Sequence, residues 1–169
     1  MKIHTLDHDF FEPRVIASYL VETDGELILI ESGPDSTFSK LKAAIEAKGF
    51  AVEDIKKVFL THIHLDHAGA AWHFADRGAT IYVHPRGAKH LAKPQRLIES
   101  AKMIFKEQMD ELWGTMKPIP EHLIHPSEDG EEVRLENTSV RTIETLGHAS
   151  HHNSYLVPVL SLLPIFPLL

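Results

Sequence analysis

Residues 61–69 read Thr-His-Ile-His-Leu-Asp-His-Ala-Gly and directly follow a short apolar run at 57–60. We expect the apolar run to be a buried strand that delivers the chain into the histidines. In an extended segment alternate side chains point the same way, so His62 and His64 can face one ion from a single stretch of backbone. Zinc accepts imidazole and carboxylate ligands, and a catalytic zinc site keeps a coordination position for water. The spacing therefore predicts a metal site.

The second half of this motif, Asp66 and His67, comes where the chain should turn into a helix that begins near Ala68. Both side chains can then swing toward a position beside the first ion. The alternative is a solvated polar loop in which Asp66 only caps the following helix. Although the chain has 13 histidines in 169 residues, chance would produce this four-residue pattern in on the order of 0.4% of such sequences, which favours the metal site.

A metal site needs a ligand from elsewhere in the chain, and His148 is the natural candidate. It follows Gly147 at the end of a predicted strand, whereas we interpret His151 and His152, close behind, as polar loop residues. The remaining histidines have no ligand-like spacing and are expected on the surface or satisfied in the core: His4, His8, His73, His84, His90, His122 and His125.

The order of predicted elements indicates an α/β domain. Hydrophobic periodicity and turn residues predict strands at 14–21, 26–31, 57–60 and 80–83, helices at 36–48 and 68–77, helical structure within 85–120, and a hairpin at 132–146 that breaks at 136–138. The first two strands flank Thr23-Asp24-Gly25, a hairpin signal.

An apolar stripe follows the predicted helical segment after Pro94. It comprises Leu97, Ala101, Ile104, Phe105, Met109, Leu112, Trp113 and Met116. Ordinary core packing is one interpretation. The other is a lid whose adaptable methionine and aromatic side chains line an apolar substrate pocket.

Composition narrows the class of protein. A length of 169 residues predicts one domain, and the absence of cysteine excludes disulfides and thiolate metal sites. A formal net charge of −7 disfavours nucleic acid as the partner. The amino terminus carries no signal-peptide pattern, so we expect a cytoplasmic protein. The apolar residues 156–169 are interrupted by prolines and are too short for a membrane span.

Three segments together resemble the metallo-β-lactamase superfamily of metallohydrolases, including its glyoxalase II and lactonase branches. They are the H-x-H-x-D-H motif, the preceding Leu-Ile-Glu-Ser-Gly at 29–33 and the later Leu-Gly-His-Ala-Ser-His-His at 146–152. The similarity runs from about Val15 to Tyr155. It implies an αββα sandwich of two similar halves, with the metals at one edge between the sheets.

By that resemblance, the first Zn2+ ion is held by His62, His64 and His148. Asp66 and His67 match two ligands of a second ion, so one site is complete and the other partial. Asp66 is also the expected catalytic residue, because it would orient the attacking hydroxide or take its proton. The bound zinc would lower the pKa of its water toward ~7 and polarise the substrate carbonyl.

The sequence also departs from the family pattern. Glu31-Ser32-Gly33 replaces the usual Asp-Thr-Gly, and no Asp, Glu or His follows His152, where the family supplies a bridging carboxylate and another histidine. These departures predict a truncated or frame-shifted member with an incomplete second half. We therefore expect a family domain at 1–157, an apolar non-family tail at 158–169, weak binding of a second metal and impaired activity.

The predicted function is a zinc-dependent hydrolase that acts on a small-molecule ester, thioester, lactone or amide. The alternative is a non-catalytic remnant, or a subunit completed by a partner, with a possible homo-oligomer formed through the apolar tail. A nuclease is disfavoured because no cluster of Lys or Arg lies near the motif.

Overall fold

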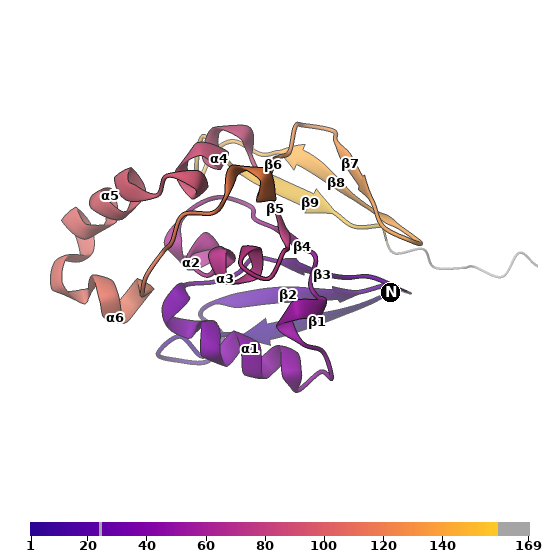
Figure 1. Ribbon diagram of the computed structural model, residues 1–169, viewed down its shortest axis with the longest axis horizontal. Coiled ribbons are helices and arrows are strands. Elements are labelled where there is room, and N and C mark those ends of the chain that lie inside the picture. The colour runs from indigo at the N-terminus through magenta and orange to yellow at the C-terminus, as the bar shows by residue number, and fades with distance from the viewer. Residues whose placement is uncertain (24, 159–169) are drawn as a thin grey trace, which may run out of the picture.

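The computed structural model describes residues 1–23 and 25–158, and two β-sheets dominate it (Figure 1). The larger sheet has strands in sequence order: β1 (Lys2–Asp7), β2 (Ala17–Glu22), β3 (Leu27–Ile30), β4 (Lys57–Phe59), β5 (Thr80–Val83) and β6 (Ile124–Pro126). Its first three strands are antiparallel, and β3 to β6 are parallel. The smaller sheet is antiparallel: β7 (Glu132–Arg134), β8 (Ser139–Glu144) and β9 (Asn153–Leu156).

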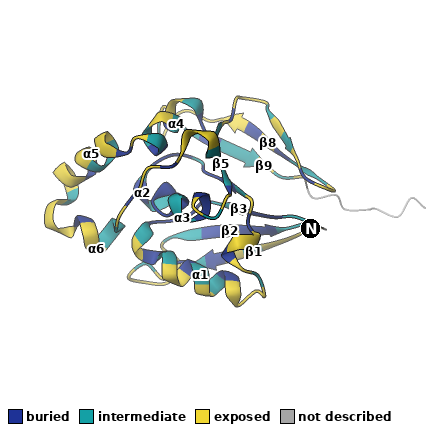
Figure 2. Cartoon of the chain, viewed as in Figure 1, coloured by how far each residue is buried: buried dark blue, intermediate teal, exposed yellow. Residues whose placement is uncertain are grey.

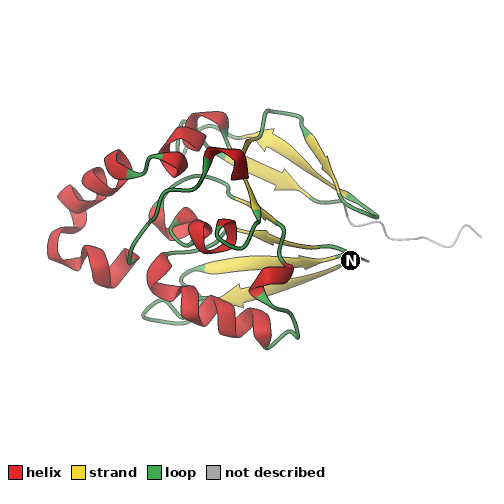
Figure 3. Ribbon diagram, in the orientation of Figure 1, coloured by secondary structure: helices red, strands yellow, loops and turns green. Residues whose placement is uncertain are grey.

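The helices of the described chain lie in two groups (Figure 3). The first group connects β3 to β4 and β4 to β5 along the chain and consists of α1 (Phe38–Glu46), α2 (Leu65–Ala68) and α3 (Ala71–Ala75). Those that follow β5 form an arm beside the sheets: α4 (Pro85–Ala92), α5 (Gln95–Phe105) and α6 (Met109–Trp113). Short 3-10 turns occupy Asp35–Thr37, Val52–Asp54, Lys106–Gln108 and Glu121–Leu123.

The larger sheet is buried on both faces, because adjacent residues of its strands point in opposite directions. Leu29 and Val58 belong to the core shared with the helices, whereas Ile28 and Phe59 belong to a second core shared with β7 and β8. The near-continuous apolar runs of β3 to β5 follow from this double burial, which is typical of parallel strands. The layers are therefore helix, sheet, sheet.

The outer face of the smaller sheet is more open. Ile143 on β8 and Leu156 on β9 point away from the larger sheet and are 39% and 50% exposed. In residues 1–23 and 25–158, the protein thus builds three layers of the expected αββα sandwich, in agreement with a fold of this class whose second half is incomplete. The described helices include none that is long and apolar enough to cross a bilayer.

The sequence predicted most elements but misplaced several boundaries. The first hairpin is confirmed by the antiparallel pairing of β2 with β3, although Asp24 of its turn lies outside the described residues, and 132–146 forms the expected β7–β8 hairpin. The single helix expected at 68–77 is instead two short helices that begin at Leu65.

One further expectation needs correction, and three strands, β1, β6 and β9, were not predicted. The helical segment at 85–120 is interrupted at Lys93-Pro94 and again at Lys106, which has a positive φ of 48°, and it ends at Gly114 with φ 68°. Strand β1 was not predicted. Its sequence mixes polar and apolar residues because it is an edge strand whose one fully buried side chain is Leu6.

Candidate metal centre

Strand β4 places the first two histidines of the motif. Its carboxyl end leads through Leu60 into the loop that carries His62 and His64, and His64 keeps extended backbone (ψ 152°) immediately before α2. The apolar residues that follow each of them, Ile63 and Leu65, are buried in the core. Packing of these apolar side chains fixes the loop and turns the two imidazoles toward the same edge of the sheet.

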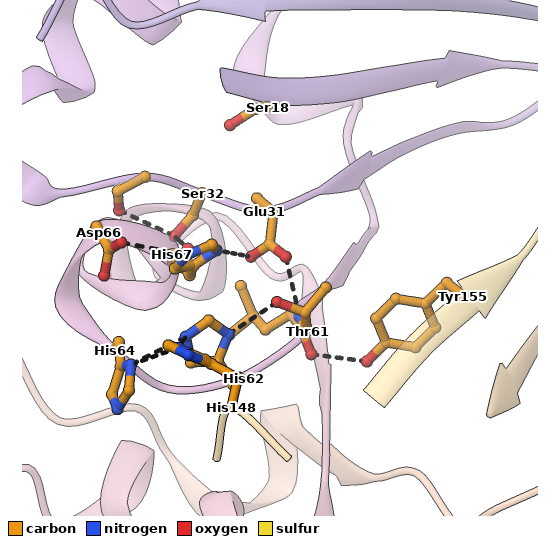
Figure 4. Close-up of polar contacts among 12 residues, drawn as sticks. Ser18, Glu31, Ser32, Thr61, His62, His64, Asp66, His67, His148 and Tyr155 are labelled. Carbon is orange, nitrogen blue, oxygen red and sulfur yellow. Dashed lines mark hydrogen bonds and ion pairs between the residues drawn. The ribbon is translucent and has the colours of Figure 1, made fainter. Parts of the chain in front are cut away.

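Strand β9 brings the third histidine to this edge. The backbone amide of Asn153 donates to the Thr61 carbonyl at 2.8 Å, and the Tyr155 hydroxyl donates to the Leu60 carbonyl at 2.8 Å. These bonds fasten the smaller sheet to the end of β4. His148, in the loop before β9, then lies over the histidine pair (Figure 4).

The three imidazoles converge on one point. His62 Nε2 lies 3.0 Å from His64 Nδ1, and His148 Nε2 lies 3.2 Å from each of these two atoms. A tetrahedral zinc ion with Zn–N distances of about 2.0–2.1 Å holds its nitrogen ligands about 3.3 Å apart. The nitrogen triangle therefore fits a single zinc-sized ion. His62, His64 and His148 form the group of potential ligands found in the described chain.

A chain of polar contacts orients the buried member of the triad. The outer nitrogen of His62, Nδ1, lies 2.9 Å from Thr61 Oγ1, within hydrogen-bonding distance. The Thr61 amide donates in turn to Glu31 Oε1 at 3.1 Å. Partners of this kind fix the tautomer and ring orientation of a metal-ligating histidine. The sequence motif gave no indication of a role for Thr61.

Glu31 also contacts the second half of the motif. Its Oε2 lies 3.3 Å from His67 Nδ1, and Asp66 Oδ2 lies 3.2 Å from His67 Nε2, so His67 sits between two carboxylates. The structure therefore places Asp66 and His67 beside the triad, and the ring centroids of His67 and His62 are 4.1 Å apart. Asp66 and His67, however, form an ion pair with each other. The group of converging ligand atoms does not include either residue.

Burial and charge act differently on the two halves of the motif. Burial lowers the pKa of His62 to about 3 and lowers that of His64, which keeps both imidazoles neutral, as a metal ligand must be. Burial also lowers the pKa of His67, but the Asp66 and Glu31 carboxylates outweigh it and raise that pKa to about 10. Burial raises the pKa of Asp66, and the contact with His67 more than offsets it, so the pKa of Asp66 is lowered.

The other nearby histidines have local roles. His152 Nδ1 lies 2.8 Å from Thr145 Oγ1, and His84 Nε2 lies 2.8 Å from Glu144 Oε1. His151 Nδ1 is buried without a hydrogen-bond partner among the described residues. The rings of His151 and His152 lie beside the triad, 6.3 Å and 5.2 Å from the His62 ring, centroid to centroid.

Two hollows of opposite character flank the triad. An apolar cavity of about 410 Å³ lies between His64 and the α5–α6 arm, lined mainly by Leu97, Ile104, Phe105 and Trp113. A more polar hollow of about 550 Å³ lies on the other side and includes Arg14, Tyr19, Thr61 and His152.

The methionines of the arm do not form a common surface. Met109 and Met116 are buried in the main core, and Met103 is exposed. Core packing is therefore the correct interpretation for these two methionines, whereas the aromatic part of the predicted stripe, Phe105 and Trp113, lines the cavity.

A family model named metallo-beta-lactamase superfamily matches residues 12–163, most of the chain and all of the site described above. The chain belongs to the metallo-beta-lactamase superfamily. The match includes both the H-x-H-x-D-H motif and His148, and it confirms the relationship that the sequence motifs indicated.

Several known proteins are similar to this chain. The metallo-beta-lactamase fold-containing protein ST1585 of Sulfurisphaera tokodaii is 24% identical over 149 residues, which cover 86% of this chain and 54% of that protein. The atrochrysone carboxyl ACP thioesterase of Aspergillus fumigatus is 27% identical over 141 residues, which cover 83% of this chain and 35% of that protein. The solved structure of MEM-A1, a subclass B3 metallo-beta-lactamase from a soil metagenome library, is 25% identical with a TM-score of 0.68, covering 92% and 54%. The chain thus spans about half the length of these metallo-beta-lactamase relatives, or less.

Proposed function

We propose that this protein is a zinc-dependent hydrolase of a small ester, thioester, lactone or amide, with the ion held by His62, His64 and His148. The observation that supports it most strongly is the triangle of three imidazole nitrogens 3.0–3.2 Å apart. Three nitrogens this close together cannot all form hydrogen bonds with one another, because each nitrogen of a neutral imidazole either donates or accepts. A cation at the centre of the triangle would interact with the lone pairs of all three.

A zinc ion bound here would supply Lewis acidity, polarising a substrate carbonyl and lowering the pKa of water. The residues of the chain do the rest. Thr61 and Glu31 hold the His62 ring in place, and burial keeps His62 and His64 neutral. Asp66 is ionised at neutral pH, because its pKa is lowered, and its carboxylate accepts the proton of the attacking water.

A second ion would take Asp66 and His67 as ligands. In the structure both nitrogens of His67 lie within 3.3 Å of a carboxylate, and its raised pKa makes it an imidazolium at neutral pH. Binding of a second ion would therefore require His67 to lose a proton and release Asp66. We propose that the first site fills at lower zinc concentration than the second.

The relatives support a hydrolase in general. One of them is named as a thioesterase, which hydrolyses an acyl substrate, and the solved neighbour MEM-A1 is named as a β-lactamase. The chain covers only 35% and 54% of these two proteins. Their names therefore support only the general proposal that the substrate contains a carbonyl group that is hydrolysed. Superfamily membership does not fix the substrate.

Metal analysis and turnover test this proposal together. After zinc loading and dialysis, the wild-type protein should retain about one equivalent of zinc and hydrolyse simple esters. His64→Ala and His148→Ala should retain less than about half an equivalent and lose turnover. His122→Ala, which removes an exposed histidine away from the triad, should behave like the wild type. Equal zinc content in all four proteins would contradict the assignment of the ligands.

A second candidate, a subunit completed by a partner, has one observation in its favour. A partner that packed on the outer face of the smaller sheet would bury Ile143 and Leu156, two exposed apolar side chains that lie there beside Arg141 and Ser154. Zinc binding without turnover, together with a concentration-dependent mass in sedimentation equilibrium, would favour this function over that of a self-sufficient enzyme. Of the apolar tail expected at 158–169 as the contact, residues 159–169 lie outside the described residues.

A further inference from the structure

The apolar cavity opens onto the triad. Its apolar wall consists of Leu65, Leu97, Ala101, Ile104, Phe105 and Trp113, and His64, Asp66 and Ser100 complete the lining. His64 is the same residue whose Nδ1 belongs to the nitrogen triangle. A molecule that occupies the cavity therefore has one end beside the reactive centre and the rest against hydrocarbon.

The wall of the cavity is held in shape by aromatic packing. The Trp113 ring stacks on Phe10 at 5.6 Å between centroids and meets the Phe105 ring edge-on at 5.1 Å. These contacts join α5, α6 and the loop between β1 and β2, so the hollow is a built feature and not a gap between mobile side chains. Its volume of about 410 Å³ lies within the range of small-ligand sites.

Ile104 is an apolar side chain of the cavity wall that other residues leave largely uncovered. This side chain lines the cavity and yet is 72% exposed, and much of α5 is exposed as well (Figure 2). An apolar ligand that reached it would remove this surface from water and gain about 0.8 kcal/mol for each buried methylene, a factor of about four in affinity.

The opposite hollow gives the bound substrate a direction. Asp66 lines both hollows, so the reactive centre lies between them. The second hollow presents Arg14, Glu31, Thr61 and His152, which suit a hydrated polar group. A charged group in the apolar cavity would lose its hydration and meet, apart from His64 and Asp66, little more than the Ser100 hydroxyl as a polar partner. The apolar part of a substrate must therefore point toward α5.

We propose that the cavity binds the acyl chain of the substrate, which makes the preferred substrates aliphatic acyl esters, thioesters or lactones. This inference rests on the proposed hydrolase function. In the reaction, water adds its oxygen to the acyl carbonyl carbon and the bond from that carbon to the leaving oxygen or sulfur breaks. The leaving group takes up a proton, and the products are a carboxylic acid, which ionises, and an alcohol or thiol.

Two measurements on the same variants separate the cavity from the chemistry. The first is binding of n-alkanols from butanol to octanol to the metal-free protein, measured by calorimetry. The second is hydrolysis of p-nitrophenyl esters from acetate to octanoate by the zinc-loaded protein. Both affinity and kcat/KM should rise about fourfold for each added methylene until the cavity is full.

The variants test the cavity directly. Ala101→Phe should fill the cavity, so that alkanol affinity and ester kcat/KM no longer rise with chain length. Ile104→Asp should weaken binding of the longer alkanols and lower kcat/KM for the longer esters at least tenfold, so that the dependence on chain length is lost. Met103→Asp is the matched control, because Met103 precedes Ile104 on α5, is 75% exposed and does not line the cavity. It should leave both series unchanged.

The outcomes distinguish the two proposals. Ester hydrolysis that is indifferent to chain length, or equal effects of the Ile104 and Met103 variants, would overturn the acyl site while leaving the hydrolase intact. Alkanol binding with the expected length dependence, but no hydrolysis of any ester by the zinc-loaded protein, would overturn the hydrolase and support the cavity as a site for aliphatic chains.

Discussion

The Asp35 carboxylate accepts a hydrogen bond from the backbone amide of Thr115 at 2.7 Å, which links the start of α1 to the end of α6. The other carboxylate oxygen lies 2.8 Å from His73 Nε2 and accepts from Trp72 Nε1 at 3.2 Å. The Trp72 indole donates to the Thr115 carbonyl as well. One largely buried carboxylate thus fastens the helical arm, whose α5 and α6 wall the apolar cavity, to the main body of the domain.

Replacing Asp35 should loosen this arm. Asp35→Ala leaves the Thr115 amide and the Trp72 and His73 side chains with fewer acceptors, and the loss of buried acceptors costs about 1–3 kcal/mol. We expect a fall in the free energy of unfolding of that size, together with faster hydrogen exchange in residues 106–116. Hydrogen–deuterium exchange measured by mass spectrometry, with chemical denaturation, checks both effects.

Asp76→Ala is the control for this variant, since Asp76 is an exposed carboxylate at the end of α3. It should leave the exchange of residues 106–116 unchanged. If both variants behave alike, the arm is held by its apolar packing alone and the Asp35 contacts are incidental.

Tyr155 should support the metal centre from a distance. Its hydroxyl donates to the Leu60 carbonyl, just before the histidine loop, and burial raises the pKa of this hydroxyl. Tyr155→Phe removes one buried hydrogen bond and should lower the free energy of unfolding by about 1 kcal/mol. Zinc affinity should fall by less than tenfold, because the Asn153 amide still ties β9 to Thr61.

Competition with a zinc chelator measures this effect. Tyr19→Phe removes the hydroxyl of an exposed tyrosine on β2 and should leave both the stability and the zinc affinity unchanged. Zinc affinity in Tyr155→Phe that falls as far as in His148→Ala would mean that His148 depends wholly on this one bond for its position.

The metal motif could be predicted from sequence because its geometry is local. His62 and His64 lie two residues apart in extended chain, and neighbouring apolar side chains fix their direction. Asp35–Thr115 and Tyr155–Leu60 could not be predicted, since these partners are 80 and 95 residues apart and meet only after the sheets and the arm have packed. His148 was expected to join the motif because it follows Gly147 at the end of a predicted strand, and the family resemblance implied the same ligand.

The elements that were missed have physical reasons too. Strand β1 lies at a sheet edge and has little apolar alternation to reveal it. The segment 95–116 has a helical pattern throughout, but the positive φ at Lys106 separates α5 from α6, and the positive φ at Gly114 ends α6. Nothing in the hydrophobic period marks a non-glycine residue that tertiary packing holds at positive φ.

Glu31 should control the charge of His67 in the metal-free protein. Its carboxylate lies 3.3 Å from His67 Nδ1 and helps raise the pKa of that imidazole to about 10. Glu31→Gln removes one of the two negative charges that stabilise the imidazolium, so the pKa of His67 should fall while remaining above its ordinary value because Asp66 is still present. Titration of the His67 ring by NMR measures the change.

A control variant tests whether the change in the pKa of His67 depends on the position of the carboxylate that is removed. Glu22→Gln removes a carboxylate from the far end of β2, where it contacts His4, and should leave the pKa of His67 unchanged. A pKa for His67 that is the same in Glu31→Gln and in the wild type would show that Asp66 alone keeps this histidine charged.

His8 should make the fold sensitive to acid. It is fully buried, with Nδ1 2.8 Å from Thr37 Oγ1 and Nε2 2.7 Å from Ser18 Oγ, and burial lowers its pKa to about 4. As pH falls below about 6.5, the unfolded chain binds a proton at this position that the native protein does not. The free energy of unfolding should therefore decrease between about pH 6.5 and pH 4, by about 3 kcal/mol from this group, and this contribution should level off below pH 4.

His8→Gln tests this sign in metal-free protein, so that loss of zinc does not contribute to the pH dependence. The variant lacks the titrating group, and although it should be less stable at pH 7, its stability should fall less steeply between pH 6.5 and pH 4. His122→Gln, an exposed histidine, should retain the wild-type slope. Urea denaturation at a series of pH values gives the slopes. A slope in His8→Gln equal to that of the wild type would assign the acid sensitivity to other buried histidines, foremost His62, whose pKa burial also lowers.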